Sequence, residues 1–150
     1  MKQIKLFEKE LDKTPVVALT GKYGPNEYFI KRDDMIPFSF GGNKVRKAIE
    51  FYRDIKEKKA DVIMTYGSNA SNHCRIIANM ATAMGLPCHI ISPSGHTEIL
   101  NNTHMVMQFG ASIELCPVEK VSATIEKRME EFRKNGKNPY FIMGGGNKYG

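Results

Sequence analysis

The sequence predicts an α/β protein in which helices cover both faces of a parallel sheet, giving three layers. Short apolar runs alternate with longer amphipathic segments from residue 44 onward, and Gly or Pro stands at most of the junctions. The composition, with 41% hydrophobic and 25% charged residues, is that of a globular protein. The 150 residues are enough for one hydrophobic core but few for a two-domain enzyme.

The first elements are two short strands and a helix. Strands are predicted at 14–19 and 27–32, and the Gly- and Pro-containing stretch 21–26 between them indicates a hairpin or an edge pair. A helix is predicted over Asn43–Lys59, because apolar residues recur there at the spacing of one helix face. These apolar residues are Val45, Ala48, Ile49, Tyr52 and Ile55.

A regular alternation of strands and helices follows. Strands are predicted at 61–66, 88–92, 112–115 and 140–143, and helices at 71–84, 98–109 and 122–135. This order implies parallel strands joined by right-handed helical crossovers. In such sheets ligands bind beyond the carboxyl ends of the strands, so the loops that begin there are the places to look for a site.

The chain is divided into three parts by these elements. Residues 1–43 hold the N-terminal strands and the approach to Lys44, and residues 44–143 form a small α/β domain. The segment 144–150, "GGGNKYG", has the composition of a phosphate loop, but no helix follows it. It is either a disordered end or the start of a further domain, and the second interpretation is favoured.

Charge and hydropathy exclude some classes of function. The net charge is +6, but the lysines are dispersed among acidic residues, as on solvated helix faces, so no nucleic-acid interface is expected. No apolar run approaches the roughly eighteen residues of a membrane helix, and the charged start is unlike a signal peptide. A cytoplasmic protein that contacts no membrane is expected.

The cysteines indicate buried free thiols. Cys74, Cys88 and Cys116 are an odd set without a C-x-x-C pair, and each lies in or beside an apolar stretch. A disulfide or zinc framework is therefore disfavoured, and a reducing compartment fits. The Met-rich segments 76–84 and 104–109 fall at helical spacing and are interpreted as core.

A lysine at the start of a helix is the first candidate for chemistry. Gly41 and Gly42 allow unusual backbone conformations and close approach of a ligand, and Lys44 follows as the helix begins. The positive end of the helix dipole favours the neutral amine that a Schiff-base lysine needs. On spacing alone, a plain turn followed by a solvated lysine is slightly favoured. The glycine spacing and Val45 exclude a Walker A loop.

The loop after the strand 61–66 is the second candidate. It offers hydroxyl and amide side chains together with backbone N–H groups at a helix start, which suits a carboxylate or a phosphate. The side chains are those of Ser68, Asn69, Ser71 and Asn72. Helix capping needs only one such residue, so four of them with a glycine favour a ligand loop.

The histidines carry weaker signals. His73 is a candidate acid or base, although a single histidine at a helix start is more often a surface or capping residue. The spacing of His89, His96 and His104 does not match that of metal ligands, so no metal site is predicted and these three are interpreted as structural.

Three motifs together resemble the fold type II family of pyridoxal 5'-phosphate enzymes. They are "KRDD" at 31–34, "FGGNKVRK" at 40–47 and "SNHCR" at 71–75, in the order and separation of that family. The resemblance covers about residues 10–150 and is strongest to the branch of 1-aminocyclopropane-1-carboxylate deaminase and D-cysteine desulfhydrase. It implies the small domain of such an enzyme, with N-terminal strands that belong to a larger domain.

The resemblance also implies roles for individual residues. Lys44 matches the lysine that carries pyridoxal 5'-phosphate covalently and moves a proton during catalysis. Asn72 matches the residue that hydrogen-bonds the ring hydroxyl of the cofactor, and Ser71, Asn72 and His73 would surround the carboxylate of a small amino-acid substrate. Enzymes of this branch act as lyases or deaminases that release an α-keto acid and ammonia, with sulfide as well from cysteine.

The sequence departs from the family pattern in two ways. The family is about twice as long, and its second half carries the phosphate cradle and the partner of the pyridine nitrogen. The chain is therefore expected to be an N-terminal portion that binds cofactor poorly alone, with a homodimer or a complementing C-terminal half as partner. The loop 33–42 is unusual, and Ala70 stands where the branch has Gln, which leaves the substrate open. A non-catalytic binding or interaction module is the alternative.

Overall fold

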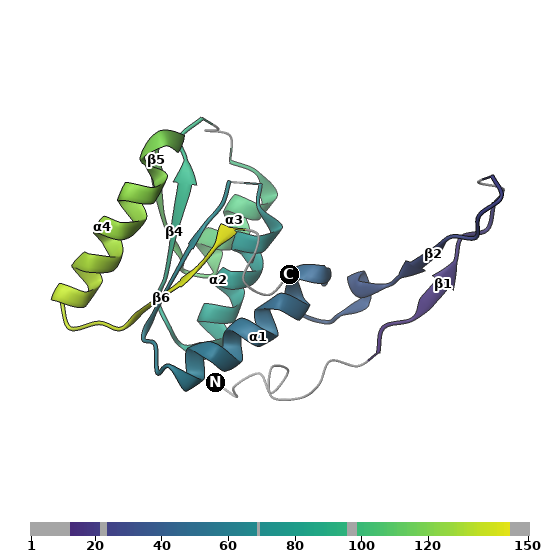
Figure 1. The fold of residues 1–150 in the computed structure, drawn as a ribbon, viewed down its shortest axis with the longest axis horizontal. Helices are drawn as coiled ribbons and strands as arrows, with labels where there is room; N and C mark the ends of the chain where they lie inside the picture. Colours follow the sequence, from purple (N-terminus) through teal and green to yellow (C-terminus); the bar gives the residue numbers. More distant parts are fainter. Residues whose placement is uncertain (1–12, 22–23, 69, 96–98, 145–150) are drawn as a thin grey trace.

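The computed structural model describes residues 13–21, 24–68, 70–95 and 99–144. Its centre is a parallel sheet of four strands in the order β5-β4-β3-β6 (Figure 1). The strands are β3 (Val62–Tyr66), β4 (Cys88–Pro93), β5 (Ser112–Cys116) and β6 (Pro139–Ile142). Each predicted strand of the sheet is present, with ends that differ from the prediction by at most one residue.

Helices cover both faces of the sheet, so the predicted three-layer α/β/α architecture is confirmed (Figure 1). One face carries α1, α2 and α3, whose apolar side chains share a large core with β3, β4 and β6. The other face carries α4 over a smaller core. The helices are α1 (Asn43–Glu57), α2 (Asn72–Met84), α3 (Asn101–Gln108) and α4 (Val121–Lys134).

The path of the chain brings two strand ends together. From β3 the chain moves outward through α2, β4 and α3 to β5, and α4 then returns it across the opposite face to β6, beside β3. Strands β3 and β6 pair in parallel, so their carboxyl ends lie at the same edge of the sheet. The strand order thus reverses between β3 and β6, and α/β proteins bind ligands outside the carboxyl ends of the strands at such a point.

The core follows the helical periodicity with two exceptions. Four of the five apolar residues predicted for the buried face of α1 are buried. The fifth, Tyr52, is only half-buried, and Phe51, which was not predicted, is buried in its place. Met80 lies in the core, whereas Met107 on α3 is 56% exposed, so the Met-rich segment 104–109 is core only in part. The prediction missed this because α3 touches the rest of the domain along a narrow stripe, its buried residues being Thr103 and Val106.

The N-terminal strands form the predicted hairpin. Strand β1 (Val16–Ala18) pairs antiparallel with β2 (Phe29–Lys31), and the pair projects away from the sheet domain (Figure 1). Large apolar side chains on this hairpin are at least 39% exposed, from Val16, Val17, Leu19, Tyr28, Phe29 and Ile30. Because a two-stranded ribbon is only marginally stable in water, this exposed hairpin is a surface suited to further packing.

Two short 3-10 helices were not predicted, because three residues are too few for a periodic pattern. They are η2 (Asp33–Met35) and η3 (Val118–Lys120). Helix α3 begins at Asn101 rather than at residue 98, after an extended Leu100 that serves as its N-cap.

All three cysteines are buried and unpaired, as predicted. Burial raises the pKa of Cys74 to about 11 and that of Cys88 to about 12, so these thiols are poor nucleophiles. No helix in the described ranges combines the length and the apolar character needed to cross a bilayer.

Candidate functional site

The loop before Lys44 depends on two glycines. Gly41 has a φ of +69°, and a Cβ at this position would lie 2.6 Å from the carbonyl oxygen of Asp34, so only glycine fits. The next residue, Gly42, donates its N–H to the carbonyl oxygen of Asp33 at 2.7 Å. The loop is therefore packed tightly against η2. It leads directly into α1, so that Lys44 lies in the first turn of this helix.

An ion pair fastens this loop to the helix that follows it. The Arg46 guanidinium donates to both carboxylate oxygens of Asp33, at 2.7 and 2.8 Å, and to the Thr14 hydroxyl at 3.0 Å. The same hydroxyl donates to Asp33 at 2.7 Å. Hydrogen bonding from Arg46 lowers the pKa of Asp33 to about 2, so the bidentate pair is intact at neutral pH. This contact gives a structural role to Asp33, the first of the two acidic residues in the "KRDD" motif.

Lys44 lies in the first turn of α1, two residues after Gly42. Its side chain is half-buried, and the N-cap Gly42 supplies no side-chain bond to the first N–H groups of the helix. Gly42 has a φ of +98°, and a Cβ there would meet no atom within 4 Å. A half-buried amine, a helix start without a side-chain cap and a glycine whose Cβ position is open thus occur within three residues of the chain.

The Ser71 loop leads from β3 into α2. Gly67 is required by close packing, since a Cβ there would lie 2.6 Å from the Cys74 sulfur. Ser71 caps α2, its Oγ accepting the N–H of Cys74 at 3.2 Å. Capping, the alternative considered for this loop, thus accounts for Ser71. Of the other candidates in the loop, Ser68 is half-buried and Asn69 lies outside the described residues.

His73 is turned into the core. It is 4% exposed, and its Nε2 lies 2.8 Å from the Thr65 hydroxyl, which itself donates to the carbonyl oxygen of Ile142 at 2.8 Å. Because that hydroxyl has a single proton, Nε2 must be the donor, and Nδ1 is left as the acceptor. This chain of bonds ties α2 to β3 and β6.

The electrostatic surroundings keep His73 neutral. Burial is the main cause that lowers its pKa to about 4, and the positive charges of Lys44 and Lys47 on α1 contribute. The two candidate loops therefore lie close enough for the positive charge of Lys44 to lower the pKa of His73 at the start of α2. As a neutral side chain, His73 is suited to accepting a hydrogen bond rather than donating a proton at physiological pH.

Asn72 is exposed and belongs to a network that was not predicted. Its Oδ1 accepts from Arg75 Nη1 at 2.9 Å and from Asn102 Nδ2 at 3.1 Å. Arg75 also lies 5.5 Å from the centre of the Phe40 ring, in the loop ahead of Lys44. The "SNHCR" motif contains Arg75, but nothing in the local sequence indicates its partners, which are 27 and 35 residues away.

The segment after β6 begins at the same edge of the sheet. A Cβ on Gly144 would lie 2.9 Å from the ring of Tyr66, the last residue of β3. The start of "GGGNKYG" therefore touches the end of β3, next to the Ser71 loop. The remainder of this segment, 145–150, lies outside the described residues.

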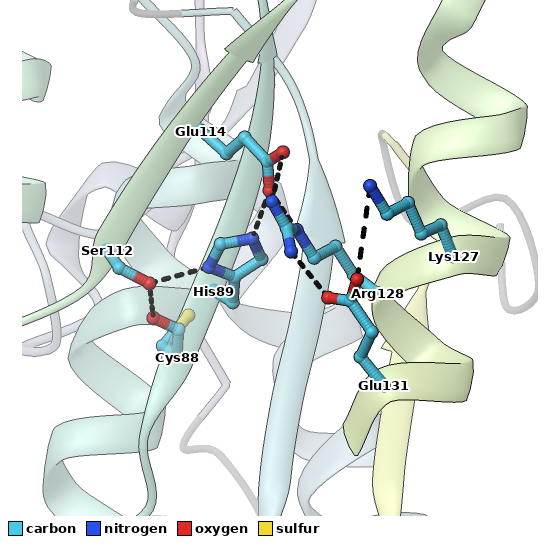
Figure 2. Close-up of polar contacts among 7 residues, drawn as sticks. All are labelled: Cys88, His89, Ser112, Glu114, Lys127, Arg128 and Glu131. Atoms are coloured by element: carbon cyan, nitrogen blue, oxygen red, sulfur yellow. Dashed lines mark hydrogen bonds and ion pairs between the residues drawn. The ribbon is translucent and has the colours of Figure 1, made fainter. Parts of the chain in front are cut away.

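A second polar cluster lies on the opposite face, under α4 (Figure 2). His89 contacts Ser112 at 2.7 Å and Glu114 at 3.0 Å, and the Arg128 guanidinium donates to both oxygens of Glu114, at 2.7 and 2.9 Å. Arg128 also pairs with Glu131. The cluster lines an open pocket of about 440 Å³, but its charges are paired and hold α4 against β5.

No group of three or more His, Cys, Asp and Glu side chains in the described ranges has the arrangement of a metal site. The candidate site therefore consists of an amine, amides, a hydroxyl and a neutral imidazole, which come from the loops that begin α1 and α2. Such a set, at the carboxyl edge of a parallel sheet, lies where α/β proteins commonly bind ligands.

Comparison with known proteins identifies the class. Residues 8–150 match the family described as "Pyridoxal-phosphate dependent enzyme", and the chain belongs to this family. Its fold is similar to that of an ACC deaminase homologue, with a TM-score of 0.76 and 27% sequence identity over 97% of this chain and 48% of the other.

Other solved structures share the fold at lower identity. A hydrogen sulfide-producing enzyme from Fusobacterium nucleatum has a TM-score of 0.68 and 19% identity, over 91% of this chain and 44% of its own. A cysteine synthase from Entamoeba histolytica has a TM-score of 0.66 and 18% identity, over 91% of this chain and 41% of its own. The chain thus spans less than half the length of each of these proteins.

Proposed function

We propose that this chain is the lysine-bearing portion of a pyridoxal 5'-phosphate-dependent lyase or deaminase that acts on a small amino acid. D-cysteine and 1-aminocyclopropane-1-carboxylate are the proposed substrates, and an α-keto acid and ammonia the proposed products. The single observation that carries the proposal is the position of Lys44, half-buried in the first turn of α1 and two residues after Gly42, whose Cβ position is open. Family membership and the 27% identity to an ACC deaminase homologue support it.

The residues present fit the reactive end of pyridoxal 5'-phosphate. Covalent attachment needs a primary amine, which Lys44 supplies, and the glycine at position 42, where a Cβ would meet no atom within 4 Å, allows a ligand to approach the main chain. The ring hydroxyl needs a hydrogen-bond donor, and the Asn72 amide is the proposed one. When bound, pyridoxal 5'-phosphate supplies a conjugated ring that takes up the electrons of a bond broken at the α or β carbon of the substrate.

The side chains of the site have distinct proposed roles. Lys44 Nζ holds the cofactor and, once free, takes or returns the proton at the reacting carbon. Ser71 and Asn72 bind the substrate carboxylate through their polar groups at the start of α2, where N–H groups favour anions. His73, kept neutral by burial, offers Nδ1 as an acceptor and fixes the position of the loop through Thr65.

A cofactor titration tests the proposal. Addition of pyridoxal 5'-phosphate to the wild-type chain should give a visible absorption band, distinct from that of free cofactor, which Lys44→Ala abolishes. Lys47→Ala, one turn further along α1, is the matched control and should keep the band. A wild-type band of equal strength in Lys44→Ala would overturn the proposal, as would the absence of any band in the wild type.

The whole reaction is proposed to need a second contribution, from a complementing C-terminal half or a second copy of the chain. The chain alone should release ammonia from D-cysteine far more slowly than typical enzymes, whose turnover is about 10 per second. Turnover at ordinary enzyme rates by the purified chain would contradict this part of the proposal.

A non-catalytic interaction module is the second candidate, favoured by the exposed apolar side chains of the β1–β2 hairpin. Under this alternative the hairpin is covered in a stable assembly and Lys44 binds no cofactor. Analytical ultracentrifugation, run beside the cofactor titration, separates the two candidates: an assembly without an absorption band would favour the module.

A further inference from the structure

Arg75 is a buried arginine near the start of α2, four residues after the Ser71 cap. The residue is only 9% exposed, although arginine is rarely buried unless it is paired. Its pKa is lowered by burial, and no carboxylate is among its hydrogen-bond partners in the described residues. A buried cation whose described polar partners are amides is costly to maintain, which suggests a specific task.

A single nitrogen of Arg75, Nη1, donates to two asparagines. Nη1 lies 2.9 Å from an oxygen of Asn72 and 2.9 Å from an oxygen of Asn102 on α3. Asn102 Nδ2 in turn donates to the carbonyl oxygen of Ala70 at 2.7 Å and to Asn72 Oδ1 at 3.1 Å. Helices α2 and α3 are thus joined through three side chains that meet just behind the ligand loop.

These contacts settle the orientation of both amides. A guanidinium can only donate, so the atom of each asparagine that faces Arg75 must be the carbonyl oxygen. The backbone oxygen of Ala70 can only accept, so the atom of Asn102 that faces it must be nitrogen. Both requirements are met at once, and Asn72 Oδ1 is the atom that meets Arg75 and Asn102, so Nδ2 is the amide group that these contacts do not use.

Arg75 also contacts the loop that carries the lysine. Its guanidinium lies 5.5 Å from the centre of the Phe40 ring, a cation–π distance. Phe40 is 74% exposed and has a φ of +63°, a left-handed conformation that is rare for a bulky residue. Arg75 Nε is buried without a hydrogen-bond partner in the described part of the chain. One side chain therefore contacts both the loop before Lys44 and the amide at the start of α2.

We infer that Arg75 and Asn102 are positioning residues that hold the Asn72 carboxamide in one orientation, so that Nδ2 is the donor it presents to a ligand. The ligand group selected in this way is a hydrogen-bond acceptor, such as the ring oxygen of pyridoxal 5'-phosphate. The reversed amide would present Oδ1 and would require a donor instead. The inference rests on the proposed function for the identity of the ligand, but the orientation itself does not depend on it.

The orientation is tested first without any ligand. Side-chain amide NMR relaxation of Asn72 should show a rigid NH2 group in the wild type and a mobile one in Asn102→Ala and in Arg75→Lys. Asn101→Ala is the matched control, because it removes the neighbouring, exposed asparagine of the same helix. An Asn72 amide that stays equally rigid in both variants would overturn the inference. If Arg75→Lys fails to fold, Asn102→Ala alone decides.

Cofactor binding then gives a second readout. Loss of the oriented donor should weaken the binding of pyridoxal 5'-phosphate to Asn102→Ala by about tenfold, the effect of one good hydrogen bond. The 3-deoxy analogue of the cofactor lacks the acceptor oxygen, so the wild type and Asn102→Ala should bind it equally. Equal losses with both compounds would contradict the assignment to the ring oxygen. Absence of a Lys44-dependent band in the wild type would instead contradict the proposed function and leave the NMR result valid.

Discussion

Two polar clusters lie on opposite faces of the sheet, and each is built around an arginine. In the cluster under α4, the nitrogens of Arg128 reach the carboxylates of Glu114 and Glu131, and the remaining contacts of Glu114 are to His89. In the cluster between α1 and α2, Arg75 reaches amides and an aromatic ring, and its buried Nε has no hydrogen-bond partner among the described residues. We call the first network closed, because its arginine is paired with carboxylates. We call the second network open, because its arginine has no carboxylate among its described partners.

Backbone strain also distinguishes the cluster around Arg75 from the cluster under α4. The loop ahead of Lys44 contains two residues other than glycine in the left-handed region, Ser39 at +49° and Phe40 at +63°. Ser39 Oγ is also buried without a hydrogen-bond partner in the described residues. Backbone strain and unmet hydrogen bonds persist where the surrounding structure enforces them, and they cluster at functional sites. The comparison teaches that the network under α4 satisfies its arginine with carboxylates, whereas Arg75 is held by amides and an aromatic ring beside a strained loop.

The largest loss of stability is expected from Gly41→Ala. The substitution combines a left-handed backbone with a Cβ placed 2.6 Å from the Asp34 carbonyl oxygen, and should lower the free energy of unfolding by about 2–4 kcal/mol. Gly136→Ala is the matched control on the side of α4, with a φ of +74° and open space around the Cβ, and should cost about 1–2 kcal/mol. Urea unfolding measures both, and equal losses would show that the packing against η2 contributes nothing.

His73→Gln tests how the stability of the region around α2 depends on pH. The pKa of His73 is about 4 in the folded protein against an ordinary 6.5, so its contribution to stability is present above pH 6.5 and is lost as pH falls toward 4. Wild-type protein should lose roughly 2–3 kcal/mol over this window.

The glutamine variant should lose much less, because glutamine donates to Thr65 without taking up a proton. His104→Gln replaces an exposed histidine of α3 and should keep the wild-type slope. A variant series with one common slope between pH 6.5 and 4 would contradict the assignment to His73.

Glu114→Gln tests the closed network and should have the smallest effect. Hydrogen bonding from Arg128 lowers the pKa of Glu114 to about 2 from an ordinary 4.5, so its contribution is present above pH 4.5 and disappears as pH falls toward 2. The substitution should cost about 1–2 kcal/mol at pH 7 and nothing at pH 2. It should leave the absorption of added pyridoxal 5'-phosphate unchanged, and a change in that absorption would show that the two clusters are coupled.

The order of helices and strands was predictable from the sequence because apolar periodicity is a local property. The buried face of α1 and the central strands follow directly from the spacing of apolar residues. The start of α3 and the exposure of Met107 were not predictable, because they depend on how closely that helix packs on its neighbours.

The candidate site was predictable only in part. Lys44 and the Ser71–Asn72 loop were found from glycines, a helix start and a set of motifs, all of them local features. The partners that orient them were not found, since Arg46 meets Asp33 across 13 residues and Arg75 meets Asn102 across 27. Side-chain partners of this kind are decided by the packing of helices, on which a single sequence gives no information.

The central claim is that Lys44 is the lysine prepared for pyridoxal 5'-phosphate. The most direct test is borohydride reduction of the chain with a limiting amount of the cofactor, followed by peptide mass mapping of every lysine. The account predicts a pyridoxyl group predominantly on Lys44, little on Lys47 of the same helix, and loss of the main product in Lys44→Arg. Labels spread evenly over the exposed lysines, with Lys44 no more reactive than Lys47, would contradict it.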